Sequence, residues 1–167
     1  YDVRVLDLCF EDDPVSATKN TLNEFQPDII GISIRNLESS TLFLIPTIKD
    51  VVDCCKNYGK GRIILGGTAF SITPEDILRY FGIELGIIGE GEESLPELLR
   101  RLSDKKPFDD IAGAAYIDNK NDFRMNMPWR LQDINKLPMP ARHLLPNHLY
   151  DMGNIQTKRG CEYSCIY

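Results

Sequence analysis

The chain has 167 residues, a length that fits one domain and is short for two. Its 19 Lys and Arg against 25 Asp and Glu give a net charge of −6, which argues against a broad nucleic-acid-binding surface, because such a surface needs a basic excess. No run approaches the ~18 apolar residues of a membrane span, and no basic and apolar leader opens the chain. We therefore expect a cytoplasmic protein with no transmembrane segment and no nucleic-acid partner.

Short apolar runs predict the strands of the fold. The runs are Val3–Leu8, Asp28–Ile34, Arg62–Leu65, Leu85–Ile88 and Ile111–Ile117. The first four are separated by segments with helical periodicity, and they do not alternate between apolar and polar residues. That combination predicts a parallel sheet covered by helices on both faces, which is a doubly wound α/β fold.

Helix start signals lie between these runs. Proline at the first helical position follows a capping residue at Asp13-Pro14 and again at Thr73-Pro74. Between residues 42 and 55, apolar residues repeat at spacings of three and four, which predicts a third helix. Ser94 and Glu97 have the spacing of a capping box, so we expect them to begin a fourth helix.

The pattern changes after the fifth run. A polar turn at residues 118–122 precedes a short segment that we expect to pair back as a hairpin. Residues 128–146 contain four prolines and little periodicity, which is typical of an ordered linker. We divide the chain into a domain at 1–127, a linker at 128–153 and the start of another domain at 154–167. The chain begins inside a predicted strand, and we interpret it as part of a larger protein.

Polar and glycine-rich turns follow three of the predicted strands. Ligands of doubly wound sheets bind beyond the carboxyl ends of the strands, so these turns are the candidate site. Two glycine turns permit close backbone approach, and together with a Ser-Arg-Asn turn they predict a wide, mostly uncharged cleft. Each glycine turn is equally compatible with a tight turn that binds nothing. The candidate residues are Ser33, Arg35, Asn36, Gly66, Gly67, Thr68, Gly89, Glu90 and Gly91.

Three other functions fit these turns poorly. Residues 89–94 resemble a dinucleotide fingerprint, but Ser94 replaces the third glycine and three glutamates would repel a pyrophosphate. The Ser33 turn lacks the second glycine of a hydrolase nucleophile elbow, because Arg35 takes its place. No lysine follows Ile88, where a phospho-receiver domain would have one.

Cys161 and Cys165 are four residues apart and have no apolar periodicity around them. Closely spaced thiolates suit an iron–sulfur cluster or a zinc site, and an incidental pair is the alternative. The remaining three cysteines, Cys9, Cys54 and Cys55, lie in strand and helix patterns, and we expect them to pack as small apolar residues.

The sequence from Thr157 through Cys161-x-x-x-Cys165-x-Tyr167 resembles the opening of the radical SAM motif, in which a third cysteine follows. The residues before it, with the Gly66-Gly67-Thr68 turn and the Gly89–Glu92 turn, resemble the N-terminal domain of the cobalamin-dependent (class B) radical SAM enzymes. The resemblance implies a Rossmann-like (flavodoxin-like) fold that lacks its first strand and helix here, with Val3–Leu8 as the second strand.

The resemblance also implies the cofactors and the reaction. Cobalamin would contact the nine candidate residues at the carboxyl edge of the sheet, and Cys161 and Cys165 would be two of three cysteine ligands of a 4Fe-4S cluster. That cluster binds and reductively cleaves S-adenosylmethionine in the full-length protein, which would then methylate or rearrange an unactivated carbon centre of a small-molecule or lipid substrate. A reductant for the cluster is an implied partner.

Two functions remain open at this stage. The first is the cobalamin-binding module of a radical SAM enzyme. In that case the chain carries no catalytic residue of its own, so we expect it to be inactive without the rest of the enzyme. The alternative is a non-catalytic cobalamin-binding or structural α/β module, in which the cysteines are incidental.

Overall fold

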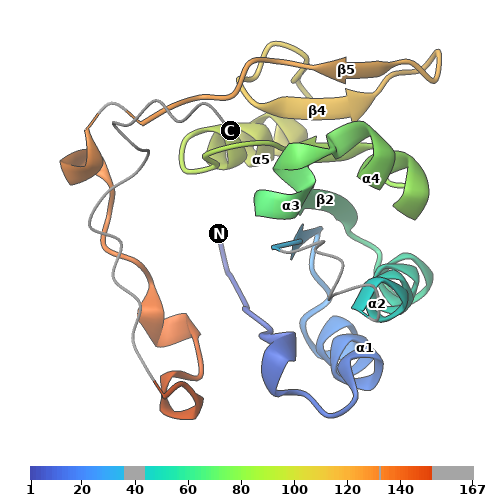
Figure 1. The fold of residues 1–167 in the computed structure, drawn as a ribbon, viewed down its shortest axis with the longest axis vertical. Helices are drawn as coiled ribbons and strands as arrows, with labels where there is room; N and C mark the ends of the chain where they lie inside the picture. Colours follow the sequence, from blue (N-terminus) through green and yellow to red (C-terminus); the bar gives the residue numbers. More distant parts are fainter. Residues whose placement is uncertain (36–43, 132, 152–167) are drawn as a thin grey trace, which may run out of the picture.

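The computed structural model describes residues 1–35, 44–131 and 133–151 (Figure 1). Within these residues, one sheet forms with the strand order β1-β2-β3-β4-β5. The strands are β1 (Ile29–Ser33), β2 (Arg62–Gly66), β3 (Leu85–Ile87), β4 (Ala114–Ile117) and β5 (Phe123–Met125). The first three are parallel, and β4 and β5 are antiparallel to their neighbours. The predicted α/β fold is confirmed, and the predicted hairpin forms as β4 and β5, which extend the same sheet.

The register of the parallel strands determines where the segments that follow them leave the sheet. Ser33 at the end of β1 lies opposite Gly66 at the end of β2, and Leu65 lies opposite Gly86 in β3. Because parallel strands end at the same edge, the segments that follow all three strands emerge side by side. That edge is the carboxyl edge of the sheet.

Five α-helices are found in the described residues, and four of them begin near the signals in the sequence. Before the first, the Asp13 side chain accepts a hydrogen bond from the Ser16 N–H at 3.0 Å, as its capping position predicts. Figure 1 shows the first two helices side by side beneath one end of the sheet. The helices are α1 (Pro14–Phe25), α2 (Leu44–Tyr58), α3 (Thr68–Ile72), α4 (Pro74–Phe81) and α5 (Ser94–Ser103), and α3 was not predicted.

Apolar side chains cover both faces of the middle of the sheet. On one face, Val52, Phe70 and Leu78 pack in one cluster with Leu65 of β2. On the other, Leu98 of α5 packs with Ile64 and other residues of the central strands. The prediction of a sheet covered on two faces therefore holds for its centre.

The predicted strand at Val3–Leu8 is wrong. These residues form no strand, Val3 and Val5 are 55% and 43% exposed, and a short 3₁₀ helix (Leu8–Phe10) begins at the end of the segment. Local sequence favours extended backbone there, but a strand also needs a hydrogen-bonded neighbour, and within the described residues none pairs with this segment. The structure thus leaves the outer edge of β1 without a described partner.

The predicted capping box is also wrong. Ser94 is the first helical residue of α5 and is buried, and the residue before it, Glu93, caps the helix without a side-chain hydrogen bond. Glu97 instead accepts hydrogen bonds from Arg100 at 2.7 Å and from Arg101 at 2.7 Å. Because the helix begins one residue earlier than the capping box requires, the Ser94 hydroxyl does not occupy the cap position.

Residues 128–151 form no long helix and no strand among the described positions. Three short 3₁₀ turns, Ile134–Lys136, Arg142–Leu144 and Asn147–Leu149, interrupt an otherwise extended chain. At its far end, the Tyr150 ring packs edge-on against Phe10 at 4.8 Å between ring centres, and the Tyr150 hydroxyl donates to Asp7. In the described part of the chain, no helix has both the length and the apolar character needed to cross a bilayer.

Candidate functional site

The turns after β1 and β2 are joined by backbone hydrogen bonds at the carboxyl edge. Ile34 donates from its N–H to the Gly66 carbonyl at 2.8 Å, and Ala69 donates to the Ile34 carbonyl at 3.0 Å. These two bonds place the end of β1 directly against the start of α3. The expected convergence of the Ser33 and Gly66 turns is confirmed.

A serine side chain joins the second turn to the third. The Ser71 hydroxyl donates to the Gly67 carbonyl at 3.0 Å and accepts from the Gly89 N–H at 2.9 Å. All three turns therefore lie at one edge and are linked through neutral groups. Sequence reasoning missed Ser71, although a serine four residues after a turn carbonyl is a known pattern for such a bond within one turn of helix.

Two of the four site glycines are required by the backbone. Gly67 has φ +97°, and a Cβ there would clash with the Ile34 carbonyl. Gly89 has φ +72°, and a Cβ there would come within 2.8 Å of the Pro128 side chain. Both conformations strongly favour glycine, so these two residues are explained by the turns themselves.

The other two site glycines have no such requirement. A Cβ on Gly66 would lie 3.7 Å from the Ile87 carbonyl oxygen, and one on Gly91 would lie 3.9 Å from its nearest neighbour, the Ile87 side chain. These are ordinary van der Waals distances, and neither residue has a left-handed φ. The fold would accept a Cβ at both positions, and both lie at the carboxyl edge.

The charged side chains near this edge form hydrogen bonds within the fold or lie at the periphery of the edge. One carboxylate oxygen of Glu90 accepts a hydrogen bond from the Leu131 N–H at 2.5 Å. Arg35, two residues after β1, lies near enough to Cys9 to favour its thiolate, but partial desolvation and the neighbouring Asp7 outweigh this and raise the pKa of the Cys9 thiol. The half-buried part of the edge is therefore lined by backbone groups and hydroxyls more than by charges.

The structure describes most of the predicted site residues. Ser33, Gly66, Gly67 and Gly89 are brought together at the carboxyl edge, with Thr68 exposed at the start of α3. Asn36 and the two motif cysteines, Cys161 and Cys165, lie outside the described residues. Among the described residues, no group of three or more His, Cys, Asp or Glu side chains is placed to hold a metal ion.

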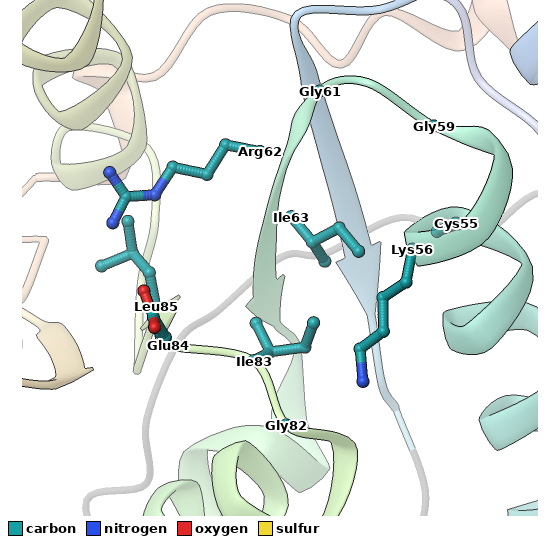
Figure 2. A pocket seen from close by; sticks show the side chains of 10 residues that line it. All are labelled: Cys55, Lys56, Gly59, Gly61, Arg62, Ile63, Gly82, Ile83, Glu84 and Leu85. Atoms are coloured by element: carbon teal, nitrogen blue, oxygen red, sulfur yellow. The ribbon is translucent and has the colours of Figure 1, made fainter. Parts of the chain in front are cut away.

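A separate hollow of about 420 Å³ lies at the opposite, amino edge of the sheet (Figure 2). The Lys56 ammonium there donates to the Phe81 carbonyl, and the Arg62 guanidinium lies over the Phe108 ring, 5.3 Å from its centre. Both cationic side chains therefore have interaction partners within the fold. The lining residues are Cys55, Lys56, Gly59, Gly61, Arg62, Ile63, Gly82, Ile83, Glu84 and Leu85. Because ligands of doubly wound sheets bind at the carboxyl ends, we place the candidate site at the other edge.

Comparisons with known proteins give the family of the chain. Residues 1–99 match the family model of the B12 binding domain. The chain is 29% identical over its whole length to an uncharacterised methyltransferase, PH0819, of Pyrococcus horikoshii, and covers 37% of that protein. It is 28% identical over 66% of its length to the tryptophan 2-C-methyltransferase of Streptomyces laurentii, and covers 19% of that protein.

A solved structure has the same fold. It is the radical S-adenosylmethionine methyltransferase TsrM from Kitasatospora setae with cobalamin and a [4Fe-4S] cluster bound. The match has a TM-score of 0.68 and 26% identity, and covers 84% of this chain and 26% of that one. The chain thus spans 37% of the length of the Pyrococcus horikoshii relative, and a smaller share of the Streptomyces laurentii and Kitasatospora setae proteins.

The family model matches more than half of the chain, so this chain belongs to the B12-binding domain family. It is a Rossmann-like module homologous to those of cobalamin-dependent radical SAM methyltransferases. The predicted resemblance is confirmed.

Proposed function

We propose that this chain is the cobalamin-binding module of a radical SAM enzyme, and that the full-length protein methylates an unactivated carbon centre. The relatives that are named methyltransferases support the reaction class, and the solved relative with cobalamin and a cluster bound supports the cofactors. The same enzyme would need a reductant for the cluster and would act on a small-molecule or lipid substrate in the cytoplasm.

One observation carries the assignment of the site. Gly66 and Gly91 are glycines that the fold itself does not demand, since a Cβ at either would make only ordinary contacts. A glycine is needed at such a position when a ligand must approach the backbone closely. Both lie at the carboxyl edge, where the other two glycines and Ser71 hold the turns in place.

The chemistry of this edge fits cobalamin. A corrin is a wide, flat macrocycle rimmed by neutral amides, so it is bound by backbone and hydroxyl groups over a broad surface. Ser33, Arg35 and Thr68 would supply side-chain hydrogen bonds, with Asn36 from the same turn as Arg35. The backbones of Gly66, Gly67, Gly89, Glu90 and Gly91 would lie against the ring. Bound cobalamin supplies methyl-transfer chemistry, and the chain holds and orients it.

An absorption titration with hydroxocobalamin tests the site in the full-length protein. Replacing Gly91 with leucine should weaken binding at least about tenfold, because the side chain fills the space that the corrin needs, while its Cβ makes only ordinary contacts within the fold. Lys105→Ala, a change at an exposed residue beyond α5, should bind like the wild type. Equal affinity of the wild type and the Gly91→Leu protein would refute the proposed site.

The cluster assignment needs its own test. We propose that Cys161 and Cys165 are two of the three thiolate ligands of the 4Fe-4S cluster that binds S-adenosylmethionine. Cys161→Ala and Cys165→Ala should each abolish 5′-deoxyadenosine formation by the full-length protein and leave cobalamin binding nearly unchanged. Retained 5′-deoxyadenosine formation would favour the alternative, a cobalamin-binding module with incidental cysteines.

A further inference from the structure

Residues 126–131, which we call the strap, cross the carboxyl edge of the sheet after β5. The backbone of Asn126 donates to the Ala114 carbonyl at 2.9 Å, and its side-chain amide donates to the carbonyls of Asp109 and Ile111 at 2.7 and 2.8 Å. One residue further on, the Met127 carbonyl accepts from the Gly113 N–H at 2.9 Å. The strap is therefore anchored firmly at its beginning.

The next part of the strap packs against two glycines. A Cβ on Gly89 would come within 2.8 Å of the Pro128 side chain and 4.0 Å of the Trp129 carbonyl oxygen. A Cβ on Gly113, which has φ +76°, would lie 3.6 Å from the Pro128 backbone. Pro128 thus packs against the Gly89 turn, at the edge where the corrin would bind.

The far end of the strap is held by a carboxylate. Leu131 donates its N–H to Glu90 at 2.5 Å, across 41 positions of sequence. A hydrogen bond to a charged acceptor is among the stronger ones in proteins, and both residues are half-buried, where water competes less. Glu90 stands between Gly89 and Gly91, so the same turn that offers its backbone to a ligand binds the strap through its side chain.

We propose that Glu90 is a positioning residue that clasps the strap over the Gly89 turn, and that the clasped strap forms a wall of the cobalamin site. The second half of this inference rests on the proposed function. The geometry also accounts for an acid in a site for a neutral ligand, since the Glu90 carboxylate accepts the hydrogen bond from Leu131. Loss of the clasp would free Trp129 and Leu131 from their places beside the turn.

The clasp can be tested without cofactor on the 167-residue chain, in which Trp129 is the single tryptophan. Trp129 is half-buried, so its emission and its quenching by acrylamide report on the strap. Glu90→Ala removes the acceptor and should red-shift the emission and raise the quenching constant about twofold. Glu90→Gln keeps an acceptor oxygen and should behave like the wild type. Glu93→Ala, which removes an exposed acid of the same loop, is the matched control and should leave the emission unchanged.

The wall is tested by hydroxocobalamin affinity in the full-length protein, with far-UV circular dichroism as the check on folding. Glu90→Ala should weaken binding about tenfold, because the freed strap no longer forms the wall, and Glu90→Gln, which keeps an acceptor oxygen, should restore the affinity. Unchanged Trp129 quenching in Glu90→Ala would overturn the clasp. A freed strap with unchanged affinity would overturn the wall and leave the proposed function standing. A wild-type protein that binds no cobalamin would overturn the proposed function and the wall together, and the quenching data would then decide the clasp alone.

Discussion

The two edges of the sheet are both rich in glycine, but for different reasons. At the amino edge, a Cβ on Gly59 would come within 2.6 Å of the Cys55 carbonyl, one on Gly61 would clash with the Pro27 carbonyl, and Gly82 has φ +58°. The backbone demands all three. At the carboxyl edge, it demands Gly67 and Gly89 but not Gly66 or Gly91. The comparison teaches that a glycine points to a ligand only after its structural reasons have been excluded.

The largest expected effect tests this comparison at one glycine from each edge. Gly67→Ala should lower the free energy of unfolding by about 3 kcal/mol or more, because the strained φ and the clash with Ile34 add together. Gly82→Ala should cost only about 1 kcal/mol, since its Cβ would meet the flexible Lys56 side chain. Chemical denaturation of the two variants measures both values. Equal losses would show that the turns of the carboxyl edge are no more constrained than those of the amino edge.

A smaller loss is expected when the link between the second and third turns is removed. Ser71→Ala removes the acceptor of the exposed Gly89 N–H, which should cost about 0.5–1.5 kcal/mol of stability, the net value of a typical hydrogen bond. Ser103→Ala, at an exposed position near the end of α5, is the control and should change stability by less than about 0.5 kcal/mol. Thermal unfolding compares them, and a Ser71→Ala protein as stable as the control would mean that the two turns hold their positions independently.

The amino edge can be probed by the reactivity of its cysteine. Burial raises the pKa of Cys55 to about 11, from a usual value near 9. The folded state therefore favours the neutral thiol, a preference that stabilises the fold below pH 9 and is lost as the pH rises toward 11. At pH 8, site-resolved alkylation should label Cys55 at least about fivefold more slowly than the exposed Cys9. Similar labelling rates would show that the amino-edge hollow opens to reagents and deserves consideration as a binding site.

The smallest effect concerns the charged side chains on the surface of α5. Hydrogen bonds from Arg100 and Arg101 lower the pKa of Glu97 to about 2, from a usual value of 4.5. The carboxylate therefore stabilises the fold above pH 4.5, and that contribution is lost as the pH falls toward 2. Because these groups lie at the surface, Glu97→Gln should shift the thermal midpoint only slightly at neutral pH, and salt should erase the difference. A large, salt-independent shift would mean that α5 relies on this cluster.

The sequence was a good guide where the deciding forces are local. Apolar runs predicted four of the five strands, and the hairpin segment predicted the remaining one. The cap at Asp13 and the turns after the first three strands were also predicted correctly. The segment Val3–Leu8 has the same local preference for extended backbone, and it failed because a strand requires a neighbour that local sequence does not supply.

The sequence by itself determined the segments of the five observed strands, four of the five described helices, and the positions of glycine at the edges of the sheet. Tertiary structure alone decided which of those glycines the backbone demands, because the clashing atoms at Gly67 and Gly89 come from Ile34 and Pro128, far along the chain. It also decided that Ser71 links two turns and that Glu90 holds Leu131, partners 18 and 41 residues apart. Hydrogen bonds and steric clashes act between atoms a few ångströms apart, and only the folded chain brings those atoms together.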